Sequence, residues 1–206
     1  MLNTEKIKEI EEALKCDQVF LKCINEAISF SGKESGHSNA SPIEDVITNA
    51  LIENCGAIKS EKSRELGDCY IDSNYINIKF GAEKFGQPNM CSMNRILAAF
   101  VEESIIDSYY IIKVKLDSAG GYSVRVFDML DYIDVLIWNA GTGQIMIKEL
   151  DFYKLEGERE QLSVSEKKRK IIDLWNKGMV EHIELRKKQH DEKLAKLSKL
   201  GYNTSI

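Results

Sequence analysis

A predicted β-hairpin over residues 68–80 constrains the fold more than any other segment of this chain. A polar turn at residues 72–74 separates two short stretches in which apolar and polar residues alternate. Strand side chains alternate between the two faces of a sheet, so Asn77 and Lys79 share one face while the isoleucines beside them point into a core. The hairpin would also bring Asp68, at the start of its first strand, close to Lys79.

The segments around this hairpin alternate between helix and strand. Helical periodicity is predicted over residues 4–30, 41–55, 91–103 and 165–200, and strands over 109–116, 122–127, 132–138 and 144–147. Such an order in one small chain favours a mixed α/β fold, with a mixed central β-sheet flanked by helices and a long, charged C-terminal helix.

Composition narrows the class of protein. The chain has 206 residues, which suits one domain with a single core, and its net charge of −5 counts against a nonspecific nucleic-acid coat protein. It has no apolar run near 18 residues and no apolar leader segment, so we expect no membrane association. Five cysteines without metal-ligand spacing predict reduced thiols and a cytoplasmic location.

The polar side chains of the hairpin are suited to phosphate chemistry. Asp68 offers a carboxylate for a divalent cation, and Lys79 offers an ammonium for an attacking water or a phosphate oxygen. A half-exposed edge strand has the same alternating pattern without any such role.

Glu44 has two interpretations. Ser41, Pro42 and Glu44 match a helix start, with Ser41 as N-cap and Glu44 completing a capping box. Spacing alone favours this cap. Glu44 also lies at the edge of the apolar stripe of its helix, where it can lean toward the sheet.

Two loops carry amides that could contact DNA bases. Gln87 and Asn89 follow the hairpin, and amide side chains of this kind pair with adenine, although Asn89 also suits the N-cap of the next helix. The loop from Asn139 to Gln144 is small and polar between two strands, which also fits an ordinary hairpin loop.

Taken together, these segments resemble the PD-(D/E)XK type II restriction endonucleases, nearest to the HincII and EcoRV type of blunt-cutting enzyme, with a C-terminal helix similar to that of SwaI. The resemblance rests on short motifs at residues 35–44, 68–79, 87–92 and 138–145, in the same order as in the family. It implies a restriction-endonuclease-like PD-(D/E)XK core.

The family resemblance implies Mg²⁺-dependent hydrolysis of double-stranded DNA, with Asp68, Asn77, Lys79 and Glu44 as catalytic residues and Asp68 and Asn77 as metal ligands. The residues that it implies for DNA contact are Lys33, Lys84, Gln87, Asn89, Ser92, Asn139 and Gln144. Recognition of a palindromic DNA site implies a homodimer, because a twofold-symmetric protein contacts both half-sites in the same way. The expected domain is 1–206, with helices over 1–34 that could dimerise, a catalytic core over 35–160 and the charged helix over 161–206.

One residue departs from the family pattern. The family usually has Asp or Glu where this chain has Asn77, so one negative charge near the cation is lost. Two alternatives stay open: a DNA repair or junction-resolving nuclease on the same fold, and a non-catalytic helical assembly protein whose C-terminal helix binds a partner.

Overall fold

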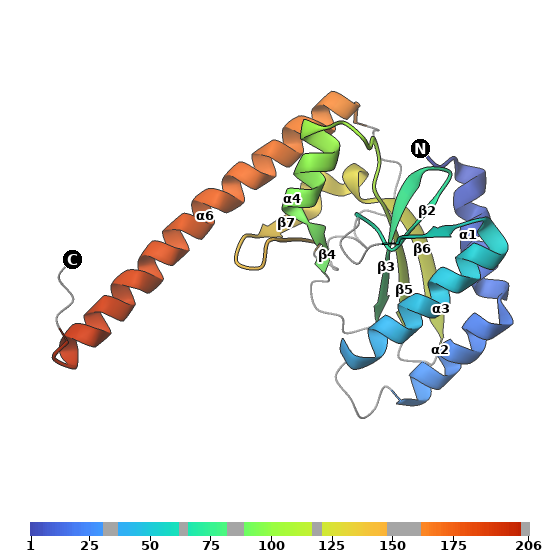
Figure 1. Ribbon diagram of the computed structural model, residues 1–206, viewed down its shortest axis with the longest axis horizontal. Helices are drawn as coiled ribbons and strands as arrows, with labels where there is room; N and C mark the ends of the chain where they lie inside the picture. The colour runs from blue at the N-terminus through green and yellow to red at the C-terminus, as the bar shows by residue number, and fades with distance from the viewer. Residues whose placement is uncertain (31–36, 62–65, 82–88, 117–120, 148–161, 203–206) are drawn as a thin grey trace.

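The computed structural model describes residues 1–30, 37–61, 66–81, 89–116, 121–147 and 162–202 (Figure 1). The helices are α1 (Thr4–Cys16), α2 (Gln18–Phe30), α3 (His37–Cys55), α4 (Met93–Ile96), the π-helical turn η1 (Leu97–Glu102), the 3-10 segment η2 (Met129–Val135) and α6 (Val164–Lys199). The strands are β1 (Ile58–Lys59), β2 (Cys69–Ile71), β3 (Asn74–Gly81), β4 (Asn89–Ser92), β5 (Tyr110–Leu116), β6 (Tyr122–Asp128), β7 (Leu136–Asn139) and β8 (Gln144–Ile147).

Five strands form the central sheet in the order β1-β2-β3-β5-β6. β3 and β5 are parallel, with Lys79 beside Lys113, whereas the other neighbouring strands are antiparallel. The parallel pair requires a crossover, which β4, α4 and η1 provide. The expected mixed α/β fold with a mixed central sheet and a long C-terminal helix is confirmed.

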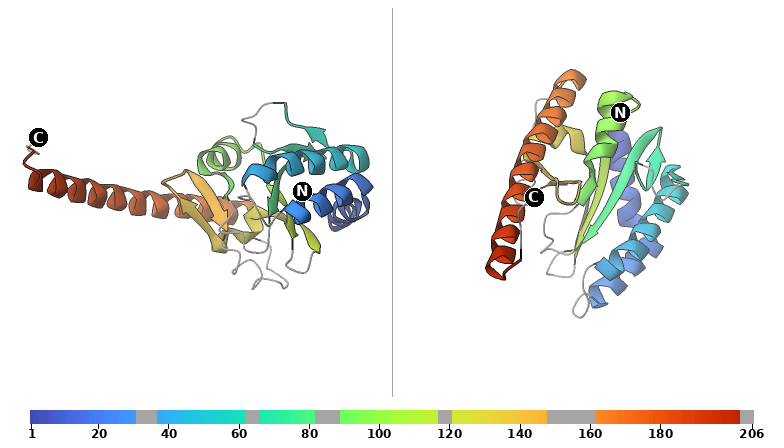
Figure 2. Two further views of the ribbon diagram at one scale, coloured as in Figure 1. Left: turned by 90° about the horizontal axis from the view of Figure 1, so that it is seen from below. Right: turned by 60° about the vertical axis from the view of Figure 1, so that its left-hand side comes forward.

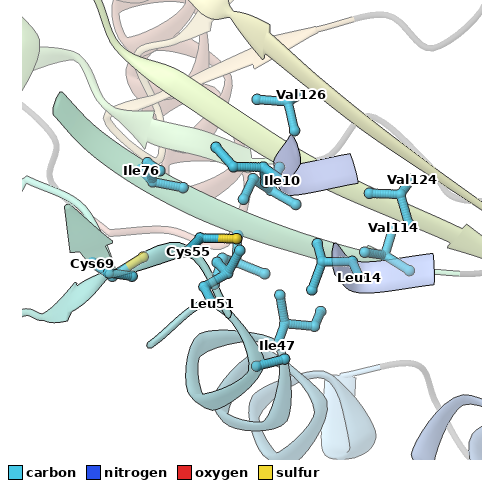
Figure 3. Close-up of a cluster of buried hydrophobic side chains, with 14 of the residues drawn as sticks. Ile10, Leu14, Ile47, Leu51, Cys55, Cys69, Ile76, Val114, Val124 and Val126 are labelled. Atoms are coloured by element: carbon cyan, nitrogen blue, oxygen red, sulfur yellow. The ribbon is translucent and has the colours of Figure 1, made fainter. Parts of the chain in front are cut away.

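Helices α1 and α3 pack on one face of this sheet (Figure 3). Ile76 and Ile78 of β3 are fully buried beneath Ile47 and Leu51 of α3 and Ile10 of α1. Burying each such side chain contributes roughly 1.5–3 kcal/mol. The other face of β3, with Asn77 and Lys79, therefore remains for polar groups.

A second layer covers the far side of the central sheet (Figure 2). Strands β4, β8 and β7 form a three-stranded sheet, and α6 packs across it. Trp138 stacks on Trp175, with ring centroids 6.4 Å apart. A Cβ at Gly178 would lie 2.5 Å from the Trp138 ring, so only glycine lets α6 approach this closely.

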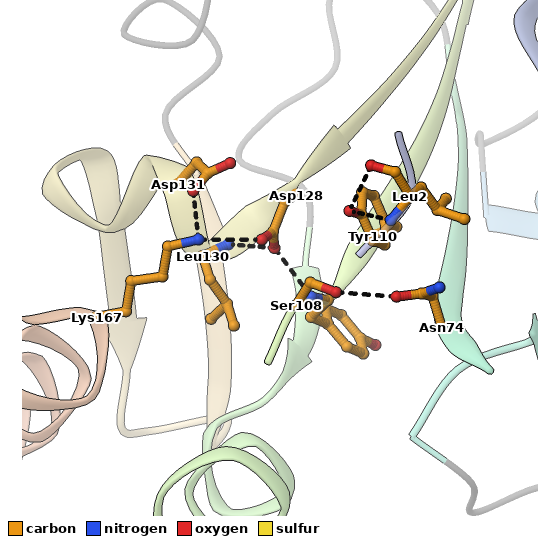
Figure 4. A network of polar contacts seen from close by, with 9 residues as sticks. Leu2, Asn74, Ser108, Tyr110, Asp128, Leu130, Asp131 and Lys167 are labelled. Carbon is orange, nitrogen blue, oxygen red and sulfur yellow. Dashed lines mark hydrogen bonds and ion pairs between the residues drawn. The ribbon is translucent and has the colours of Figure 1, made fainter. Parts of the chain in front are cut away.

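A buried ion-pair network joins α6 to the central sheet (Figure 4). Lys167 pairs with Asp131 and, at 3.3 Å, with Asp128 at the end of β6. Burial lowers the pKa of Lys167, but the two carboxylates raise that pKa more, so the net shift is upward. The backbone amides of Tyr109 and Leu130 donate to Asp128, at 2.9 and 3.0 Å, so this carboxylate also fixes the start of β5.

Three expectations about element boundaries are wrong. α3 begins at His37, so Ser41 does not cap it; Pro42 lacks only one backbone donor, and the helix continues through it. Residues 89–92 form β4 because they pair with β8. Residues 132–135 belong to η2, where the Asp128 side chain accepts from Leu130 and turns the chain before β7 begins.

All five cysteines are free thiols, as expected. Burial is the largest cause that raises the pKa of the Cys69 thiol, to about 12, so this thiol stays protonated and packs as an apolar group. Within the described ranges, no helix is long and apolar enough to cross a membrane.

Candidate active site

The β2–β3 hairpin places Asp68 against β3, the strand that carries Asn77. Asp72 and Ser73 have positive φ of 48° and 63°, the geometry of a two-residue type I′ turn, which confirms the turn expected here. This turn pairs Cys69 with Ile76, and Asp68, the residue before Cys69, lies just beyond this last pair.

Asp68 is held at both its backbone and its side chain. Its amide donates to the Ile76 carbonyl at 2.8 Å, and its Oδ2 accepts from the Ile78 amide at 2.6 Å. The carboxylate thus accepts a hydrogen bond from a backbone amide of β3, at a point where β2 has ended and provides no carbonyl. A Cβ at Gly67 would lie 2.6 Å from the Ile76 carbonyl oxygen, so glycine is required for this close approach.

The Asn77 amide is oriented by a tyrosine. Its Nδ2 donates to the Tyr109 hydroxyl at 3.1 Å, and that hydroxyl donates to the Leu66 carbonyl at 2.6 Å. Burial raises the pKa of Tyr109 well above its usual value, so the hydroxyl keeps its proton. The other amide atom, Asn77 Oδ1, is buried without a hydrogen-bond partner among the described residues. Such an oxygen is suited to a water or a cation.

Glu44 belongs to this group of charges. Burial is the largest cause that raises its pKa; the Lys79 ammonium lowers that pKa, and the Asp68 carboxylate raises it further. Both side chains therefore lie close enough for their charges to act on Glu44. The capping interpretation is wrong, because α3 begins at His37 and Glu44 lies inside the helix.

These side chains suit a magnesium ion. Asp68 and Glu44 provide carboxylate oxygens and Asn77 an amide oxygen, the hard donors that Mg²⁺ prefers. Among the described residues there is no group of three or more His, Cys, Asp or Glu side chains with metal-ligand spacing. Two carboxylates with one amide suffice for Mg²⁺, because this ion keeps several of its waters in protein sites.

The strand register reveals further cations that sequence reasoning does not place. Lys113 of β5 lies beside Lys79, and Arg125 of β6 lies opposite Lys113, so three cations form one row across the sheet, of which Lys113 is buried. Only the pairing of distant strands creates this row. The contact of Tyr109 with Asn77 likewise cannot be recognised from sequence spacing, because it too depends on the pairing of distant strands.

Three of the residues expected to contact DNA lie outside the described ranges, namely Lys33, Lys84 and Gln87. Asn89 is the first residue of β4, where it pairs with Met146. The expectation that Asn89 caps the following helix is wrong, since α4 begins after Ser92.

Three other residues of that set lie side by side. Ser92, Gln144 and Asn139 form one transverse row across β4, β8 and β7. The Asn139 Oδ1 accepts from the amides of Gly141 and Thr142, at 3.1 and 3.3 Å, so it also closes the β7–β8 turn. Asn139 therefore stabilises the hairpin turn, and this role is compatible with a contact to DNA.

Comparison with known proteins finds likenesses in structure but no match in sequence. No protein-family model and no curated protein matches the sequence. A restriction endonuclease solved in complex with substrate DNA is similar to this chain, with a TM-score of 0.46 and 14% sequence identity. The match covers 82% of this chain and 94% of that chain. The blunt-cutting HincII, EcoRV or SwaI type stays a prediction.

Proposed function

We propose that this chain is a Mg²⁺-dependent type II endonuclease that hydrolyses double-stranded DNA at a specific sequence. The observation that supports this most is the grouping at the open end of the β2–β3 hairpin. There the Asp68 carboxylate accepts from the amide of Ile78, the residue after Asn77, and the charges of Lys79 and Asp68 both act on Glu44. Blunt ends and a single nuclease domain over 1–206 rest on the sequence resemblance.

Each side chain has a distinct role in this proposal. Asp68 and Asn77 would hold the cation, and Glu44 would lie beside it or bind a second one. Bound Mg²⁺ stabilises negative charge on a phosphate and lowers the pKa of a bound water. Lys79 orients the attacking water and stabilises charge on the phosphorus centre as the phosphodiester bond breaks.

The DNA surface in this proposal extends from the site to the second sheet. Lys79 provides positive charge for a phosphate, and its neighbours in the row, the buried Lys113 and the half-buried Arg125, add to the local positive potential. The polar row of Ser92, Gln144 and Asn139 provides groups that can reach base edges. Local positive charge of this kind is compatible with the net charge of −5.

Replacing Asp68 with Asn is expected to remove cation-dependent cleavage while preserving the fold. The Asn oxygen can still accept from the Ile78 amide, but the negative charge that attracts the cation is lost. DNA binding without metal should not weaken, because a negative charge near the phosphates is removed. Plasmid cleavage and DNA titration in metal-free buffer check both parts.

Asp72→Asn is the matched control for this prediction. Asp72 is an exposed acid in the turn of the same hairpin, so the same chemical change there should leave cleavage intact. Equal cleavage by Asp68→Asn and wild type would contradict a metal-ligand role for Asp68.

We also propose that two copies associate through α6. One stripe of this helix repeats at alternating spacings of three and four residues, the pattern of a coiled-coil seam. Its members are Val180, Ile183, Lys187, His190, Leu194 and Leu197. The Val180 and Ile183 side chains are 56% and 59% exposed, although both are apolar. Figure 1 shows this part of α6 running away from the rest of the molecule.

Charges beside the seam favour a parallel pair. In that arrangement Arg186 of each copy faces Asp191 of the other copy. An antiparallel pair would instead place Arg186 near Lys193 and Glu184 near Asp191, which are like charges. A parallel pair satisfies the twofold symmetry that reading a palindrome requires.

Ile183→Glu is expected to convert a dimer into a monomer, because it places a carboxylate in the seam. Leu185→Glu is the matched control: Leu185 is also apolar and exposed, but it lies on the outer face of the helix, off the seam. Light scattering at several protein concentrations measures the mass. A monomeric wild type, or equal masses for the two variants, would contradict pairing through this stripe.

A further inference from the structure

The contact between Tyr109 and Asn77 accounts for an amide at a position where a carboxylate is expected. A tyrosine hydroxyl has one proton to donate, and Tyr109 gives it to the Leu66 carbonyl at 2.6 Å. Toward residue 77 the hydroxyl can therefore only accept. The Asn77 Nδ2, at 3.1 Å, meets this requirement, whereas a carboxylate would place two acceptors face to face.

The same proton count decides which way the amide points. If Asn77 were turned over, its oxygen would compete with the Leu66 carbonyl for the single hydroxyl proton. The observed orientation satisfies both contacts and leaves Oδ1 buried, with no partner in the described part of the chain. Asn77 shares the face of β3 that also carries Lys79, and the amide of the next residue, Ile78, binds the Asp68 carboxylate.

Tyr109 is itself held firmly. Its side chain is fully buried, its amide donates to Asp128 at 2.9 Å, and its carbonyl accepts from the Met129 amide at 2.8 Å. The hydroxyl is therefore a fixed point against which the amide of Asn77 is set.

We propose that Tyr109 is a positioning residue that turns the Asn77 oxygen toward a divalent cation and makes position 77 specific for an amide. The cation part rests on the function proposed above. Tyr109 touches neither cation nor DNA in this proposal and acts only through Asn77. Removing a group that orients a metal ligand typically lowers metal affinity by roughly 10–100-fold.

The test is a double-mutant cycle of Tyr109→Phe and Asn77→Asp, read by calorimetric titration with Mn²⁺ in the absence of DNA. Mn²⁺ accepts the same oxygen ligands as Mg²⁺. With Asn77 present, Tyr109→Phe should weaken Mn²⁺ binding by roughly 10–100-fold, because the amide is no longer oriented. In the Asn77→Asp background, Tyr109→Phe should have little effect, because a carboxylate offers an oxygen in either orientation.

Tyr110→Phe is the matched control. Tyr110 also loses a buried hydrogen bond, the one that its hydroxyl accepts from the Leu2 amide at 2.8 Å on the opposite face of the sheet. It should lower the melting temperature without changing Mn²⁺ affinity. The same melting measurement on all variants shows whether they are folded at the titration temperature.

The outcomes separate this inference from the proposed function. Suppose that wild type binds Mn²⁺, but Tyr109→Phe lowers Mn²⁺ affinity equally in the Asn77 and Asn77→Asp backgrounds, or in neither. That result would overturn the positioning role alone. Wild type that binds no Mn²⁺ and cuts no DNA would overturn the proposed function and this inference with it. Loss of affinity only in the Asn77 background supports the proposal.

Discussion

Lys79→Ala is expected to slow DNA cleavage by about 10²–10³-fold, the typical cost of removing one preorganised group that stabilises transition-state charge. Lys79 lies on the polar face of β3, and its charge acts on Glu44. In the proposed function, this is where phosphate charge would develop. Its apolar neighbours Ile78 and Phe80 point into the opposite core. Stability should therefore change by no more than about 0.5 kcal/mol. Single-turnover cleavage and thermal melting measure the two effects.

Lys59→Ala is the matched control for this result. Lys59 belongs to the same sheet, in β1, but is exposed and pairs with Asp45 at 3.1 Å on the surface. Cleavage by Lys59→Ala should match that of wild type. Undiminished cleavage by Lys79→Ala, or its unfolding, would contradict the role given to Lys79.

Lys167→Met is expected to lower the free energy of unfolding by about 3–5 kcal/mol, because it leaves the buried Asp128 carboxylate without its cation. For a chain of this length, that change corresponds to a fall in melting temperature of roughly 6–20 °C. Adding Asp128→Asn should restore part of the loss, because the buried charge is gone while an oxygen can still accept from the Tyr109 amide. Thermal unfolding of the single and double variants measures this.

Lys170→Met makes the same chemical change one turn further along α6. Lys170 pairs with Asp134 at 2.6 Å, but this ion pair is partly exposed and should contribute about 0–1 kcal/mol. Similar melting temperatures for Lys167→Met and Lys170→Met would show that the buried network does not anchor α6.

The hairpin can be predicted from sequence because its signals are local. Strict alternation in β3 and a polar two-residue turn determine which side chains share a face, so the pattern correctly predicts Asn77 and Lys79 on the polar side. The long helix α6 has an equally local signal, and its capping box at Ser163 and Glu166 is present. Such elements need no information from distant parts of the chain.

The surroundings of the site cannot be predicted in the same way, because they depend on tertiary pairing. The capping motif at Ser41 is a valid local pattern, yet α3 begins earlier and Glu44 lies within the helix. Asn89 has good N-cap propensity, but pairing of β4 with β8 takes it into a strand. The contact of Tyr109 with Asn77 joins residues 32 positions apart, which no spacing rule indicates.

The most direct test of the central claim is sequencing of the DNA ends left after incubating plasmid with the full chain and Mg²⁺. Two controls test for a contaminating nuclease: Lys79→Ala purified in the same way as wild type, and a wild-type reaction with chelator. The account predicts that wild type with Mg²⁺ cuts both strands at one defined sequence, that the reaction with chelator leaves the plasmid intact, and that Lys79→Ala cuts at least about 100-fold more slowly. Intact plasmid across a panel of DNA sequences, or equal cutting by the Lys79→Ala preparation, would contradict it.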